Sequence, residues 1–119
     1  MKAILIDPKE NKISEIEGDF SDIKIIHGVL QCETFCGAGV PNTSRPEIFY
    51  LDDEGMFNSK DYWNYAGYHQ TLAGRGLIVG VGSGGYEQST SLTVDEVKSK
   101  VTFDVEFDPS KLEFRIYAL

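Results

Sequence analysis

The sequence contains no long hydrophobic run. Its longest uninterrupted apolar pieces, such as 3–6 and 48–51, have four residues, whereas a membrane-spanning helix needs about 20. The opening "MKAILIDPKE" is also too short for the apolar core of a secretory signal. We therefore expect a cytoplasmic protein without a membrane partner.

Positive charge is also scarce. The chain has 11 lysine and arginine residues against 19 acidic residues, which gives a formal net charge of −8. Nucleic-acid-binding proteins neutralise phosphates with clustered basic side chains. This sequence has no such cluster, so we expect no direct nucleic-acid binding. An acidic surface favours solubility, and it also suits a basic protein partner.

Cysteines are few, and no metal-ligand spacing is present. Cys32 and Cys36 are the only cysteines. On a strand they would lie about 13 Å apart, too far for a disulfide or a shared metal, although a helix would bring them together. Zinc binding would also require His27 or His69, and neither has finger-like spacing. We predict buried, reduced thiols and no bound metal.

A phosphate-binding loop is only partly present. Residues 80–85, "GVGSGG", fit the dinucleotide-binding glycine fingerprint, and Asp104 lies where that fingerprint has an acid. The mechanism also needs a helix directly after the third glycine, but "YEQSTSL" has no helical pattern. We expect a turn and no cofactor, although the amides of Gly82, Gly84 and Gly85 could still contact a small anion.

The hydrophobic pattern indicates one globular domain over residues 1–119. A continuous apolar or alternating pattern, typical of strands, occurs at residues 2–6, 12–17, 47–51, 77–81, 101–107 and 112–117. The last two segments predict a C-terminal hairpin over 101–117, since a Pro-containing turn separates them.

Two short helices are expected besides the strands. Residues 19–31 repeat apolar side chains at helical spacing, and Asp19 or Ser21 can cap the helix. Thr93 and Glu96 form a capping box that begins a second helix. The sequence thus predicts an α+β fold with a mostly antiparallel sheet of about six or seven strands.

Two clusters of side chains could carry function. Four aromatic residues fall within seven positions, namely Tyr62, Trp63, Tyr65 and Tyr68. Such side chains are common at binding surfaces, but a small domain also needs them in its core, and both interpretations stay open. The acids at 52–54 could hold a catalytic metal, although consecutive acids are more typical of a turn.

Several segments resemble a family of small uncharacterised proteins that phages, plasmids and other mobile elements carry. These are "MKAILIDP", "YLDDEG" and "QTLAGRGLIVG", so the resemblance covers roughly residues 1–85. It implies no catalytic residue set, but it implies an accessory protein that acts by binding. The framework that it suggests consists of Asp52, Asp53, Gly55, Gln70, Leu72, Ala73, Gly74, Gly76 and Gly80.

Three functional hypotheses follow, and no motif requires an enzyme. The first is a non-enzymatic protein that binds a host or phage protein through its acidic and aromatic surface. The second is a binder or sponge, that is, a protein that binds or sequesters a small, nucleotide-like molecule. The third is a small metal-dependent hydrolase. The residues of the second hypothesis are Arg75, Gly82, Gly84, Gly85, Tyr62, Tyr65, Tyr68 and Gln70. Apolar-faced hairpins also leave room for a homodimer.

Overall fold

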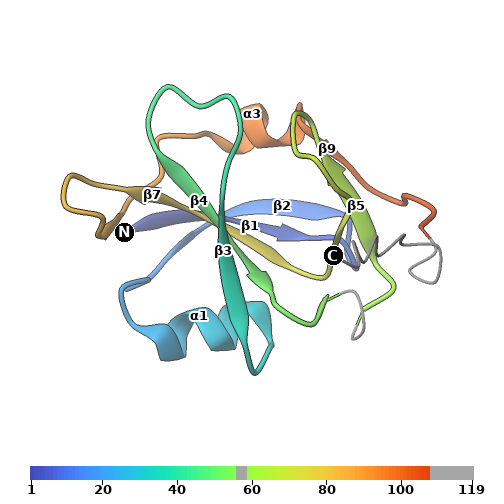
Figure 1. Ribbon diagram of the computed structural model, residues 1–119, viewed down its shortest axis with the longest axis horizontal. Coiled ribbons are helices and arrows are strands. Elements are labelled where there is room, and N and C mark those ends of the chain that lie inside the picture. The colour runs from blue at the N-terminus through green and yellow to red at the C-terminus, as the bar shows by residue number, and fades with distance from the viewer. Residues whose placement is uncertain (56–58, 108–119) are drawn as a thin grey trace, which may run out of the picture.

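The α+β prediction is confirmed by a computed structural model, which describes residues 1–55 and 59–107 (Figure 1). Two antiparallel sheets and two helices make up this part of the chain. The strands are β1 (Lys2–Asp7), β2 (Lys12–Glu17), β3 (Phe35–Gly39), β4 (Glu47–Asp52), β5 (Tyr62–Tyr65), β6 (Leu72–Ala73), β7 (Gly76–Val81), β8 (Glu87–Gln88) and β9 (Val101–Thr102), and the helices are α1 (Ile23–Leu30) and α3 (Val94–Lys98).

Strand β7 is at the centre of the larger sheet, whose order is β2-β1-β7-β4-β3. Ile78 of β7 pairs with Ile4 of β1 on one side and with Phe49 of β4 on the other. The short strand β8 extends the β1 side by pairing with the end of β7. A central strand is covered on both faces, which explains why "LIV" is continuously apolar.

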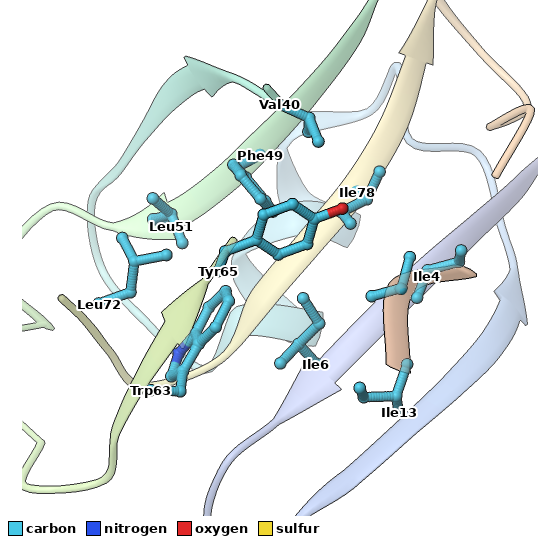
Figure 2. Packing of buried hydrophobic residues seen from close by; sticks show 11 residues of the cluster. Ile4, Ile6, Ile13, Val40, Phe49, Leu51, Trp63, Tyr65, Leu72 and Ile78 are labelled. Atoms are coloured by element: carbon cyan, nitrogen blue, oxygen red, sulfur yellow. The ribbon is translucent and has the colours of Figure 1, made fainter. Parts of the chain in front are cut away.

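The core has two parts, one on each face of this sheet. On one face, Leu77 and Val79 of β7 pack with Phe20 and with Ile26 and Leu30 of α1. On the other face, Ile78 contributes to a cluster that the smaller sheet, of order β6-β5-β9, and α3 complete (Figure 2). The residues of that cluster are Ile4, Ile6, Ile13, Val40, Phe49, Leu51, Trp63, Tyr65, Leu72, Ile78 and Val97.

The helix caps agree with the sequence at α3 and differ at α1. Thr93 accepts the N–H of Glu96 at 3.1 Å, as the capping box predicts. The N-cap of α1 is Asp22, however, and the prediction of Asp19 or Ser21 is wrong. The Asp19 carboxylate instead accepts from the N–H and hydroxyl of Ser21. These local bonds form a turn before the helix and lower the pKa of Asp19.

The prediction of one strand over residues 101–107 is wrong beyond Thr102. Strand β9 covers only Val101–Thr102 and pairs with β5. Asp104 has a φ of 55°, a left-handed conformation that is incompatible with a continuing strand. Its carboxylate accepts from the Asn11 side chain at 3.0 Å. Residues 112–117, the second strand of the predicted hairpin over 101–117, lie outside the described residues.

Candidate functional site

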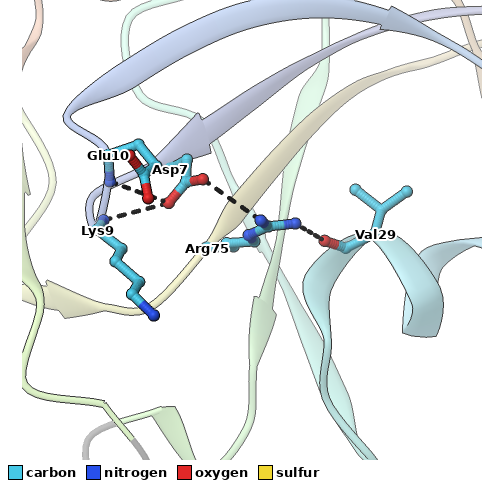
Figure 3. A network of polar contacts seen from close by, with 5 residues as sticks. All are labelled: Asp7, Lys9, Glu10, Val29 and Arg75. Carbon is cyan, nitrogen blue, oxygen red and sulfur yellow. Dashed lines mark hydrogen bonds and ion pairs between the residues drawn. The ribbon is translucent and has the colours of Figure 1, made fainter.

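Arg75, the predicted anion contact, forms an internal ion pair. Its Nη2 lies 3.3 Å from Oδ2 of Asp7, and its Nη1 donates to the carbonyl of Val29 at 3.0 Å (Figure 3). The guanidinium therefore connects the end of β1 to the last turn of α1. Asp7 neutralises the charge of the guanidinium, and the two contacts use part of its hydrogen-bonding capacity. The geometry therefore gives Arg75 a structural role.

The predicted glycine loop is the turn of the β7–β8 hairpin. The N–H of Gly82 donates to the carbonyl of Tyr86 at 2.8 Å, and the N–H of Gly85 donates to the carbonyl of Gly82 at 3.1 Å. Gly84 has a φ of 92°, which L side chains rarely adopt. Two of the three proposed amides are thus used within the turn, and a helix does not follow it.

Arg75 and this turn lie at opposite ends of β7. Arg75 directly precedes Gly76, the first residue of the strand, and Gly82 directly follows Val81, the last. At the rise of an extended strand, the two sites are roughly 20 Å apart. The structure therefore does not bring the residues of the predicted small-molecule site together.

The aromatic run belongs mainly to the core. Trp63 is fully buried, Tyr65 is 5% exposed, and the ring of Tyr68 stacks on Phe49 with a centroid distance of 5.8 Å. The indole N–H of Trp63 donates to the carbonyl of Gly74 at 2.8 Å. Burial is also the main cause of the raised pKa values of Tyr65 and Tyr68.

The outer parts of the same segment do not form a stacking site. Tyr62 is half-buried, and its ring contacts Phe107 edge-on at 5.2 Å. Gln70 is exposed in the loop before β6. With Tyr65 buried, the three tyrosines that were predicted for base stacking do not share one accessible surface.

Polar groups instead surround a cavity of about 370 Å³ at the end of the larger sheet where β7 begins. Since β1 and β4 both run antiparallel to β7, both end where β7 begins. The last residues of β1 and β4, Asp7 and Asp52, therefore lie at this end together with Arg75. The lining residues are Asp7, Pro8, Lys9, Glu10, Leu30, Gln31, Asp52, Ser59, Asp61, Gly74 and Arg75.

Among the described residues that line this cavity, carboxylates outnumber cations. Its acids are Asp7, Glu10, Asp52 and Asp61, and its cations are Lys9 and Arg75. Arg75 is paired with Asp7, and the other Asp7 oxygen accepts from the N–H groups of Lys9 and Glu10. Glu10 and Asp61 are exposed, so their charges face solvent.

A second cavity of about 350 Å³ extends this acidic surface. Its lining shares Gln31 and Asp52 with the first cavity and adds Glu33 and Glu54. We name the combined surface, with the carboxylates of Asp7, Glu10, Glu33, Asp52, Glu54 and Asp61, the acidic face. Its charge favours a cationic ligand and repels phosphates, because like charges that share a site disfavour one another.

The acids at 52–54 do not converge on one point. Asp53 and Glu54 are exposed, and Asp52 accepts the N–H of Glu54 at 2.9 Å. Across residues 1–55 and 59–107, no group of three His, Cys, Asp or Glu side chains could hold a metal ion. The geometry of this turn thus gives the hydrolase hypothesis no support.

The prediction of two buried thiols is wrong for Cys36, which is exposed, while Cys32 is half-buried; both are free. Cys36 lies on β3, the last strand of the larger sheet on that side. Partial burial raises the pKa values of both thiols, followed by the negative charge of Asp52 for Cys32 and that of Asp53 for Cys36. A raised pKa reduces the thiolate fraction and hence the nucleophilicity.

Both histidine rings pack against neighbouring groups. Nδ1 of His27 lies 3.1 Å from the carbonyl oxygen of Cys32, and its ring packs edge-on against Phe35. The ring of His69 lies against Tyr68 with a centroid distance of 4.5 Å. Both rings therefore have structural neighbours.

Comparisons with protein families, with characterised proteins and with solved structures find no match to this chain. Neither helix in the described part of the chain is long and apolar enough to cross a membrane.

Proposed function

We propose that this chain is a non-enzymatic binding protein whose acidic face receives a basic segment of a protein partner. One observation carries the proposal. The ends of β1 and β4, the turn after β1 and the segment before β5 place four carboxylates around one cavity. Among the described residues, only two cations line it, and one of them, Arg75, is internally paired. Lysine and arginine side chains of a partner would complement this charge.

The size of the cavity is consistent with side-chain capture. A volume of about 370 Å³ is near the lower limit for small-molecule pockets, and it would accommodate one or two long basic side chains. The exposed carboxylates of Glu10 and Asp61 at its rim would accept their hydrogen bonds. The resemblance to proteins of mobile elements supports a host or phage protein as the partner.

The test compares two variants with the same change in charge. In the first, Glu10→Lys and Asp61→Lys reverse two exposed acids of the acidic face. In the second, Glu15→Lys and Glu17→Lys reverse two exposed acids on β2. The probe is a fluorescent peptide rich in lysine and arginine, titrated at two salt concentrations.

We expect the first variant to lose at least tenfold in affinity for the peptide and the second to lose far less. Equal losses would mean that only net charge matters, and the proposal would then be wrong. A nucleotide panel in a thermal-shift assay tests the competing sponge hypothesis. Nucleotide-dependent stabilisation that grows with ligand concentration would favour that hypothesis instead.

A further inference from the structure

Strand β3 forms one edge of the larger sheet. Within the described ranges, β3 pairs with β4 on one side and with no strand on the other (Figure 1). Its sequence, "FCGAG", has no charged residue, and Cys36, Gly37 and Gly39 are exposed. The opposite edge, β2, carries the exposed charges of Lys12, Glu15 and Glu17, as protected edges usually do.

The register shows which backbone groups face outward. The N–H of Val40 donates to the carbonyl of Glu47, and the N–H of Asp53 donates to the carbonyl of Thr34. Bonded residues alternate along an antiparallel pair. It follows that the N–H and C=O groups of Phe35, Gly37 and Gly39 point away from β4 and are available to another strand.

Charge at the two ends of this edge selects the orientation of that strand. The end where β3 begins is acidic, with Glu33 and Asp53 exposed. After β3, the loop over residues 40–46 contains a single charged residue, the exposed Arg45. An antiparallel second copy would bring the acidic end of each copy to the Arg45 end of the other, whereas a parallel copy would place acid against acid.

We propose that two copies of this chain associate through β3, antiparallel about a two-fold axis at Gly37, so that their larger sheets become one. This register pairs Gly37 with Gly37 and Phe35 with Gly39 of the second copy, which uses all of the outward backbone groups. It also places Cys36 opposite Ala38 of the second copy, beside a cavity of about 240 Å³ that Tyr68 and His69 help to line.

Gly39 provides a matched pair of variants. Its backbone groups face outward, so Gly39→Pro removes an N–H that the second copy needs while leaving the β3–β4 ladder intact. Gly39→Ala keeps the N–H, and the added methyl has open space around it. We expect light scattering to give twice the 13.3 kDa chain mass for the wild type and Gly39→Ala, and a monomer for Gly39→Pro.

Fluorescence of Trp63, the single tryptophan, which is buried, shows whether each variant is folded. If Gly39→Pro fails to fold, Ala38→Cys gives an independent test. The proposed register puts Cys36 and residue 38 of the second copy at a non-hydrogen-bonded position with Cα atoms about 4.5 Å apart, a distance suited to a disulfide. Mild oxidation should then produce a covalent dimer with that linkage, whereas Ser83→Cys should not.

Three outcomes would overturn the proposal: a wild type that stays monomeric at high micromolar concentration, a folded Gly39→Pro that remains dimeric, or an oxidised Ala38→Cys that lacks the linkage. A pure monomer that carries a co-purified peptide, lost in Gly39→Pro, would assign the edge to a foreign strand instead of a second copy.

Discussion

Removal of the buried Glu47 carboxylate should be among the most destabilising single changes in this chain. Glu47 is 4% exposed at the start of β4. One of its oxygens accepts from the Thr90 hydroxyl at 2.9 Å, and the other accepts from the N–H and hydroxyl of Ser91 at 2.8 and 2.6 Å. These bonds attach the segment that leads into α3 to the larger sheet.

The magnitude follows from what Glu47→Ala leaves behind. Hydrogen bonds to a charged acceptor contribute about 1.5–3 kcal/mol each, and the three bonds here are not additive because they share one loop. Thr90 is only 9% exposed, so its hydroxyl would lose its partner in a buried place. We expect a loss of about 3–5 kcal/mol of unfolding free energy, out of about 5–15 kcal/mol for a typical domain.

Urea unfolding followed by Trp63 fluorescence measures this loss as a shift in midpoint at constant slope. Glu47→Gln keeps one acceptor oxygen, and we expect it to lose about 1–3 kcal/mol. Glu15→Ala is the control, since Glu15 is exposed on β2 and should change stability by less than about 0.5 kcal/mol. One ordinary hydrogen bond contributes about 1 kcal/mol. If the unfolding free energy of Glu47→Ala lies within about 1 kcal/mol of that of Glu15→Ala, the reasoning is refuted.

Three further predictions concern other sites. Burial and the hydrogen bond to Glu87 raise the pKa of Tyr50 from 10.0 to about 12. The contribution of Tyr50 to the unfolding free energy is therefore complete below pH 10 and is lost as the pH rises towards 12. In urea unfolding from pH 8 to 11.5, the unfolding free energy of Tyr50→Phe should decline less steeply than that of the wild type. Arg75→Ala should lower the unfolding free energy by about 1–2 kcal/mol, because the contacts to Asp7 and Val29 are lost. The affinity for the basic peptide should not fall. A tenfold loss of that affinity in a folded variant would give Arg75 a direct role in binding. Gly84→Ala should lower the unfolding free energy by about 1–2 kcal/mol because Gly84 has a positive φ. In the same assay, Gly28→Ala in α1 should raise it by about 0.5–1 kcal/mol, since the added methyl meets nothing within 4 Å. Effects of the same sign would contradict this.

Local signals predicted much of the fold. The continuous "LIV" of β7 and the capping box at Thr93 were recognisable because each depends on residues close in sequence. The segment that contains β5 gave no clear pattern, because that strand has four residues and its aromatic side chains suit either a core or a surface. Asp104 ended the predicted strand at 101–107 through a backbone conformation that alternation of side chains does not encode.

The acidic face could not be predicted, because it depends on strand order. Asp7 follows an ordinary apolar strand, and nothing near it in sequence indicates that Asp52 and Asp61 lie at the same cavity. The partner of Arg75 was hidden for the same reason, since Asp7 is 68 residues away. The proposed ligand role of Arg75 rested on the flanking Gly74 and Gly76, which lie at the start of β7. Gly82, Gly84 and Gly85, the other glycines of that predicted site, belong to the hairpin at the far end of the strand.

The central place of β7 also has a consequence for the order of folding. The hairpins β1–β2 and β3–β4 are local and can form as soon as they leave the ribosome. In the described part of the chain, β7 lies between these two hairpins in the sheet. The N–H of Lys2 also donates to the Ser89 hydroxyl, 87 residues further along the chain. Pairing over such separations is slow. Both hairpins therefore keep their apolar edges uncovered until β7 pairs with them. A nascent chain stalled before Gly76 should therefore depend strongly on chaperones, and release of the next ten or so residues should end that dependence.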